Sequence, residues 1–83
     1  MTMSFTVHLF AGARELARAE TVTIDLPAGA TVADVRTALA RAKPILTRLL
    51  GRSAIALNHD FADDDHILAP GDELAVIPPV SGG

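Results

Sequence analysis

Length, composition and charge exclude several classes of protein. The chain has 83 residues, with seven Lys or Arg and ten Asp or Glu, so its formal net charge at pH 7 is −3. We expect one small domain, because 49% hydrophobic residues are too many for a disordered segment and the chain is too short for two cores. The acidic balance argues against nucleic acid as a partner, since phosphate contacts require a basic surface.

Membrane, secretion and thiol chemistry are also disfavoured. No run of 18 apolar residues predicts a membrane span, and the N-terminal residues lack the pattern of a secretion signal, so we expect a cytoplasmic protein. The sequence contains no cysteine, which removes disulfides, a thiolate nucleophile and zinc ligation by thiolates.

The first third of the chain predicts two strands. Residues 4–10 and 21–26 alternate between apolar and polar side chains, which is typical of strands with one buried face. Residues 11–20 break this period and predict a loop with a short helix. Pro27 begins the turn that ends the second strand.

The middle of the chain predicts the main helix. Apolar side chains recur at helical spacing from Val32 to Ala42. Thr31 and Asp34 form a variant capping box at its start. Pro44 ends this helix, because proline disfavours helical geometry at the preceding residue. A second, short helix is predicted over residues 44–50.

The remaining residues predict further strands and a tail. Residues 53–58 and 73–77 have strand patterns, and a short strand is predicted over residues 66–68 within an acidic stretch. This order predicts an α+β fold of the β-grasp, ubiquitin-like type, with a mixed sheet of four or five strands and one main helix packed on one face. Its first and last strands lie side by side and parallel. We expect a domain over residues 1–77 and an extended tail over residues 78–83.

The tail itself predicts chemistry. Its residues are Pro78, Pro79, Val80, Ser81, Gly82 and Gly83. The prolines cannot donate ladder hydrogen bonds and favour a stiff extended segment, whereas the glycines carry no side chain and leave a thin tip. A partner could therefore draw the tail through a narrow channel and reach the carboxylate of Gly83.

That carboxylate needs activation before it can react. It is a poor electrophile, but its adenylate carries a good leaving group, and attack by sulfide or a persulfide then gives a thiocarboxylate. The chain supplies no base or metal for these steps. We therefore expect no bound cofactor or metal, and a separate activating enzyme that uses ATP. The competing interpretation is an ordinary frayed terminus.

Several short motifs extend from the first strand to the end of the chain: Leu9-Phe10-Ala11, Arg14-Glu15-Leu16, Ala56-Leu57-Asn58, Gly71-Asp72-Glu73-Leu74-Ala75 and the terminal Pro-Pro-Val-Ser-Gly-Gly. In these motifs the sequence resembles the small subunits of molybdopterin synthase, a family of sulfur carriers in molybdenum cofactor biosynthesis.

The resemblance implies a role for the tail and two partners. A ubiquitin-activating-like adenylyltransferase would adenylate Gly83, which is then thiocarboxylated. The tail would enter the large subunit of molybdopterin synthase, where its sulfur passes to the cyclic pyranopterin precursor within a heterotetramer. Catalytic side chains would belong to the large subunit, so this chain would be a non-catalytic sulfur donor.

The strand alternation also predicts a partner-binding face. The outward residues on the sheet face opposite the helix are Phe10, Ala54, Ala56, Ala75 and Ile77. Phe61, after the third strand, joins Phe10 and Ile77 in this predicted surface, since an acidic domain rarely exposes such an apolar patch without a use. These positions match those with which the family docks both partners. Alternatively, Phe10 folds under residues 11–20 and Phe61 fills a small satellite core.

Three other functions stay open. Relatives that carry sulfur for thiamine or another metabolite also end in Gly-Gly, although they generally lack the Pro-Pro pair. A ubiquitin-like modifier would form isopeptide bonds with lysines of target proteins. A plain interaction module would have a glycine tail without any role.

Two groups of charged residues have simpler interpretations. Residues 63–65, all Asp, predict a solvated acidic loop rather than a calcium site, because no glycine or distal Glu completes a calcium loop. Arg14 is predicted to pair with Glu15 or Asp72, or else to touch a partner.

Overall fold

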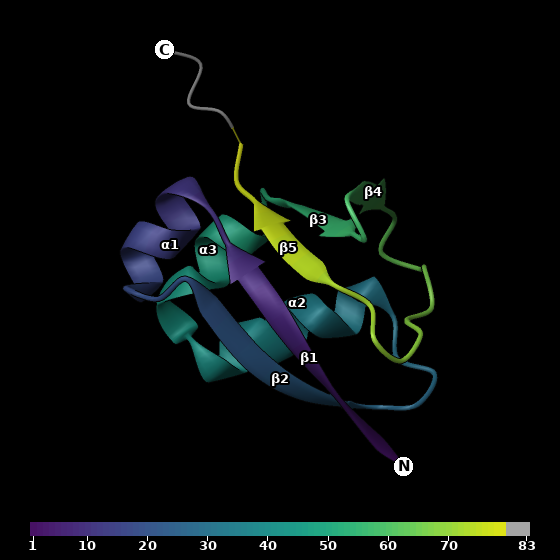
Figure 1. The fold of residues 1–83 in the computed structure, drawn as a ribbon. Coiled ribbons are helices and arrows are strands. Elements are labelled where there is room, and N and C mark those ends of the chain that lie inside the picture. The colour runs from purple at the N-terminus through teal and green to yellow at the C-terminus, as the bar shows by residue number, and fades with distance from the viewer. Residues whose placement is uncertain (80–83) are drawn as a thin grey trace.

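One five-stranded sheet forms the centre of the molecule (Figure 1). The computed structural model describes residues 1–79; residues 80–83 lie outside the described part of the chain. The strands are β1 (Thr2–Leu9), β2 (Thr21–Pro27), β3 (Ala54–Leu57), β4 (Asp60–Ala62) and β5 (Leu74–Ile77). Their spatial order is β2-β1-β5-β3-β4.

The last strand, β5, occupies the middle of this sheet. It pairs in parallel with β1 on one side and antiparallel with β3 on the other, and the remaining pairs are antiparallel. This mixed sheet, with its first and last strands adjacent and parallel, confirms the predicted β-grasp fold.

The helical elements are α1 (Ala11–Ala17), α2 (Val32–Ala42), the single 3-10 turn η1 (Pro44–Leu46) and α3 (Thr47–Leu50). Helix α2 crosses behind the sheet in Figure 1. No helix within residues 1–79 is long and apolar enough to cross a membrane.

Both predicted ends of α2 are confirmed. The backbone N–H of Thr31 donates to the carboxylate of Asp34 over 2.9 Å, and the reciprocal bond of the capping box is also present. At the other end, the backbone N–H of Lys43 donates to the carbonyl of Leu39, and Pro44 follows in η1.

The core lies between α2 and the sheet. The core includes Phe5, Val7 and Leu9 of β1 and Val32, Val35 and Leu39 of α2, none of which is more than 2% exposed. Each such side chain contributes about 1.5–3 kcal/mol through burial, which holds α2 against one sheet face. No helix of residues 1–79 covers the opposite face (Figure 1).

The fourth strand lies earlier than predicted. The strand expected over residues 66–68 is wrong, since Ile67 forms only an isolated bridge to Thr31. Instead β4 follows β3 directly through Asn58 and His59, whose φ angles are 50° and 76°. Positive φ at both central positions is what a two-residue hairpin turn of type I′ requires. The backbone of the loop after β4 bonds to the start of α2.

Arg14 also departs from its prediction. Its guanidinium lies 3.0 Å from the carboxylate of Glu20, so neither predicted carboxylate partner, Glu15 nor Asp72, is correct. The side chains of Arg14 and Glu20 are both exposed, so their ion pair adds little stability.

Arg18 follows the end of helix α1 and has the left-handed conformation with φ 54°. The turn at this residue leads the chain from α1 into β2.

Candidate functional site

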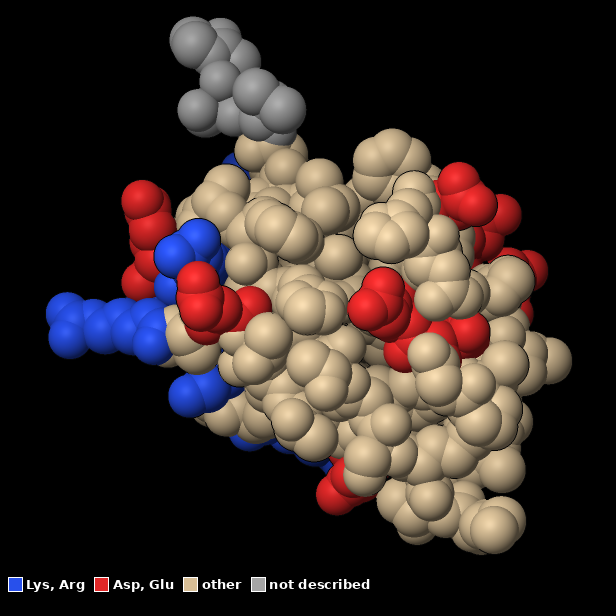
Figure 2. Space-filling model, viewed as in Figure 1, with Lys and Arg blue, Asp and Glu red and all other residues tan. Residues whose placement is uncertain are grey.

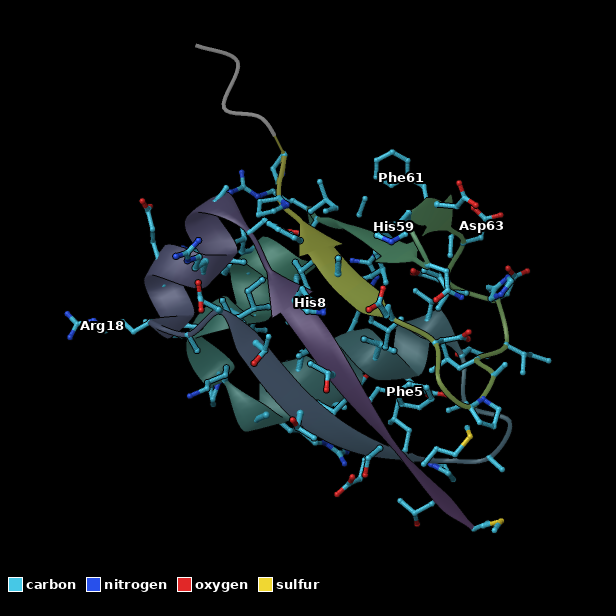
Figure 3. The ribbon with its side chains drawn as sticks, in the orientation of Figure 1. Phe5, His8, Arg18, His59, Phe61 and Asp63 are labelled. Carbon is cyan, nitrogen blue, oxygen red and sulfur yellow. The ribbon has the colours of Figure 1, made fainter. Side chains whose placement is uncertain are left out.

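A groove of about 500 Å³ lies on the sheet face that α2 leaves open. Its lining residues are His8, Phe10, Ala56, His59, Phe61, Glu73, Leu74, Ala75 and Ile77. Figure 2 shows this face as largely uncharged, with carboxylates at its border. Figure 3 shows His8, His59 and Phe61 on the viewer's side of the sheet.

Small side chains on the central strands form the floor of the groove. Ala75 on β5 is the register partner of both His8 on β1 and Ala56 on β3. A methyl group projects little from the sheet, so the centre of the face is hollow. Phe10 follows β1 on one side, and Phe61 lies on β4 at the other.

The three predicted partner-binding residues thus line one groove. Phe10, Phe61 and Ile77 all contribute to it, whereas Ala54 does not. The alternative in which both phenylalanines are buried is wrong, because Phe10 is 48% and Phe61 76% exposed. Their binding of a partner stays a prediction.

Asn58 fixes the hairpin that carries Phe61. Its side-chain amide donates to the carboxylate of Asp72 over 2.9 Å, and its side-chain oxygen accepts the backbone N–H of Glu73 over 2.9 Å. Its own backbone N–H donates to the carbonyl of Glu73. The motif that ends at Asn58 and the motif that contains Asp72 and Glu73 are distant in sequence but contact each other here. The groove wall is held before any partner arrives, which lowers the ordering cost of binding.

A polar rim borders the groove beside this hairpin. His59 Nε2 lies 3.7 Å from Glu73 Oε2, and both side chains are mostly exposed. Sequence patterns indicate the position of His8, which alternates with Phe10 on the outward face of β1. The strand predicted over residues 73–77 likewise places Glu73 on the same outward face as Ala75 and Ile77, but no pattern indicates His59, which lies in the hairpin turn.

The predicted tail begins where the groove ends. Ile77, the last residue of β5, lines the groove, and Pro78 and Pro79 follow it outside any helix or strand. Because β1 and β3 hold β5 on both sides, a partner seated on the groove would hold the start of the tail in a defined place. The other predicted tail residues, Val80, Ser81, Gly82 and Gly83, lie outside the described residues.

The acidic loop is tied to the fold. Asp64 Oδ1 accepts a hydrogen bond from Arg36 Nε over 2.9 Å. Within residues 1–79, no group of three or more His, Cys, Asp or Glu side chains is arranged to hold a metal ion.

The topology of the mixed sheet and the helix packed on one of its faces define a ubiquitin-like β-grasp protein. Residues 7–83 match the ThiS family, a range that includes the whole tail. The chain therefore belongs to the ThiS family, which confirms the resemblance that its motifs carry.

Similar proteins carry two kinds of name. The molybdopterin synthase sulfur carrier subunit of Arabidopsis thaliana is 37% identical to this chain over 82 residues, which cover 99% of this chain and 85% of the relative. The Chlamydomonas reinhardtii protein of that name is 36% identical over 83 residues, covering 98% and 100%. Small archaeal modifier protein 1 of Haloferax volcanii is 40% identical over 83 residues, covering 90% and 95%.

Solved structures show the same likeness. The crystal structure of small archaeal modifier protein 1 from Haloferax volcanii superposes with a TM-score of 0.86 at 38% identity, covering 96% of this chain and 99% of that one. A complex of subunits 1 and 2 of the molybdopterin-converting factor from Helicobacter pylori matches with a TM-score of 0.67 at 29% identity, covering 98% and 100%.

Proposed function

We propose that this chain is a sulfur carrier for molybdopterin biosynthesis. The observation that carries the proposal is the ThiS family match, which extends through the tail to Gly83. Relatives at 36–37% identity that are named as sulfur carrier subunits of molybdopterin synthase support it. In this function Gly83 supplies the reactive carbonyl, and no side chain of the chain itself takes part in the chemistry.

Two reactions load the tail. The carboxylate of Gly83 attacks the α-phosphorus of ATP, which gives an acyl adenylate and releases pyrophosphate. With hydrosulfide as the nucleophile, sulfur attacks the acyl carbon, AMP leaves with the C–O bonding electrons and a proton is released. The product is a thiocarboxylate, whose sulfur is the atom delivered. A separate ubiquitin-activating-like adenylyltransferase performs the adenylation, so ATP is bound by that enzyme.

The receiving partner is the large subunit of molybdopterin synthase. The Helicobacter pylori complex of subunits 1 and 2 supports this assignment. The groove is the proposed docking surface, because it is apolar and continuous with the strand from which the tail departs. The large subunit would supply the catalytic groups that transfer sulfur to the cyclic pyranopterin precursor, in a heterotetramer located in the cytoplasm.

Intact mass tests the proposed function directly. Protein isolated from its host cells should contain a fraction that is heavier by about 16 Da, since sulfur replaces one oxygen. Cells that lack the activating enzyme serve as the control, and their protein should show only the unmodified mass. Finding no heavier fraction while the cells synthesise the cofactor would contradict the proposal.

A ubiquitin-like modifier is the second candidate. The 40% identity to a small archaeal modifier protein favours it specifically. A modifier would join the carboxyl group of Gly83 to lysine amines of target proteins, so the same cells should contain this chain in higher-mass adducts. A carrier that is never conjugated would show the heavier fraction and no adducts.

Substitution in the groove should weaken docking to both partners. Phe61→Asp places a charge in an exposed aromatic position of the groove wall, and we expect at least about tenfold weaker binding to the large subunit and to the activating enzyme. Ile45→Asp is the matched control, because Ile45 is 60% exposed but lies in η1, outside the groove. Calorimetric titration that finds equal affinities for the two variants would exclude this surface.

A further inference from the structure

The outer edge of β2 offers unpaired backbone groups. β2 is the edge strand beside β1. At the two ends of the β1–β2 ladder, the backbone N–H of Leu9 donates to the carbonyl of Glu20, and that of Ala28 donates to the carbonyl of Met1. In an antiparallel ladder, hydrogen-bonded residue pairs alternate with pairs that are not hydrogen-bonded. Because Glu20 and Ala28 are both hydrogen-bonded to the β1 side, the even-numbered residues of β2 between them also bond to β1, and the backbone groups of the odd-numbered residues point outward.

The outward backbone groups belong to Thr21, Thr23 and Asp25, up to Pro27, which has no N–H. A free strand edge of this kind is a template for pairing with another extended chain. Charged side chains and proline on an edge strand are common devices that block such pairing, and β2 carries them only toward its end, at Asp25 and Pro27. No charge of β2 points inward, since its side chains on the helix side are the buried Val22, Ile24 and Leu26.

A groove of about 670 Å³ accompanies this edge, between β2 and α2. Its floor includes Ile24 and Leu26 from the strand and Ala38 and Ala42 from the helix. The two alanines are small enough to admit a side chain from a chain lying beside β2. The edge therefore combines backbone pairing groups with an apolar depression on one side.

Charges of opposite sign lie at the two ends of this groove. α2 runs back behind β2 after the connecting turn (Figure 1). Its first turn, which contains Asp34, therefore lies toward the Pro27 end of β2, and its last turn, which contains Arg41, lies toward the start of the strand. The two positions are seven residues apart in a helix, or about 10 Å along its axis. Among residues 1–79, Arg41 has no ion-pair partner. Asp25, also at the Pro27 end, accepts a hydrogen bond from Ser4.

We propose that this edge binds an extended segment of a partner protein as a sixth strand of the sheet. The side chains of the bound segment that face the groove are basic, apolar and acidic at every second position, so that the basic one meets Asp34 and the acidic one meets Arg41. These two side chains lie about 13 Å apart along a strand. That distance agrees with the spacing of Asp34 and Arg41 to within the reach of the side chains. The site is separate from the apolar groove on the sheet face, so it is independent of the proposed function.

A short peptide provides the probe. Acetyl-Thr-Lys-Thr-Ile-Thr-Glu-Thr-amide carries the three groove side chains on one face and threonines on the other. Titrated into isotopically labelled full-length protein, it should shift backbone amide signals of β2 and α2 and slow amide exchange at Thr21, Thr23 and Asp25. A peptide with glutamine in place of both charged residues should bind about fivefold more weakly, since two exposed ion pairs are lost.

Two variants decide whether the backbone edge and Arg41 take part. Thr23→Pro removes one outward N–H at an edge position that tolerates proline, and should weaken binding about tenfold. Thr23→Val keeps this N–H and should bind as the wild type does. Arg41→Glu should bind the peptide more weakly and should prefer a peptide in which lysine also replaces the glutamate. This reversal tests the role of Arg41 without a proline substitution, which could disturb the fold.

Three results would overturn the proposal. In the first, Thr23→Pro and Thr23→Val bind the peptide equally well. In the second, the signals that shift belong to the groove around Phe61. In the third, the protein without peptide forms dimers through β2, because the edge would then pair with a second copy. Thiocarboxylate loading should be the same in every variant, so the failure of either proposal can be recognised without the other.

Discussion

Removal of Gly83 should abolish thiocarboxylate formation completely and leave the folded domain unchanged. The reactive group is a main-chain carboxylate, so its position along the chain decides whether it reaches the activating site. Six residues separate it from β5 and span at most about 20 Å when extended. Each residue removed shortens that reach by about 3.3 Å, and removal of both glycines leaves the bulkier Ser81 at the end.

A peptide tag separates loss of the carboxylate from loss of folding. Six histidines appended after Gly83 convert its carboxylate to an amide, which cannot be adenylated, and loading should fall to zero. The same tag before Met1 is the matched control, because Met1 is fully exposed at the other end of the chain. Intact mass after incubation with the activating enzyme, ATP and a sulfur donor measures loading, and circular dichroism checks the fold. A loaded C-terminally tagged protein would disprove the role of Gly83.

The fold was predictable where short-range patterns determine it. The alternation in β1 and β2 depends only on neighbouring residues, and the structure buries the expected face of each strand. The limits of α2 follow from Thr31, Asp34 and Pro44, which act within one helical turn of each end. The parallel pairing of β1 with β5 followed from fold type, because no local pattern encodes it.

The hairpin shows where local patterns fail. Asn58 is a favourable first residue of a two-residue turn, but His59 is an unusual second one, since glycine normally supplies the positive φ. The acidic stretch after it therefore resembled a loop. Three hydrogen bonds between Asn58 and residues 72–73 hold the turn, and these partners are 14–15 residues away in sequence. Contacts at that separation carry no signature in a single sequence.

The candidate site was predictable in part for the same reason. Strand alternation determines the face on which Phe10 and Ile77 lie, and both line the groove. Phe61 was expected in a loop and reaches the groove as part of β4. Alternation also places Glu73 on this face, but its approach to His59 could not be predicted, because it depends on the geometry of the turn. The edge of β2 became recognisable only once the strand order was known.

Replacement of Arg36 should destabilise the protein more than that of any surface charge. Its side chain is only 23% exposed, and its guanidinium donates from Nη1 to the carbonyls of Leu50 and Ser53 and from Nε to Asp64. These bonds join α2 to the end of α3, to the start of β3 and to the acidic loop. Hydrogen bonds to a charged group contribute about 1.5–3 kcal/mol each, and the carbonyls left behind would be partly buried.

Arg36→Met isolates these bonds, because methionine retains most of the aliphatic stem. We expect the free energy of unfolding to fall by about 3 kcal/mol and the melting temperature to fall by about 10–20 °C in a domain of this size. Asp64→Asn removes only the exposed ion pair and should cost less than about 1 kcal/mol. Arg41→Met makes the same substitution on the same helix at an exposed site and should change stability by no more than about 0.5 kcal/mol. Urea denaturation of the three variants measures the difference. Equal midpoints for Arg36→Met and Arg41→Met would mean that solvent replaces the bonds of Arg36 without loss.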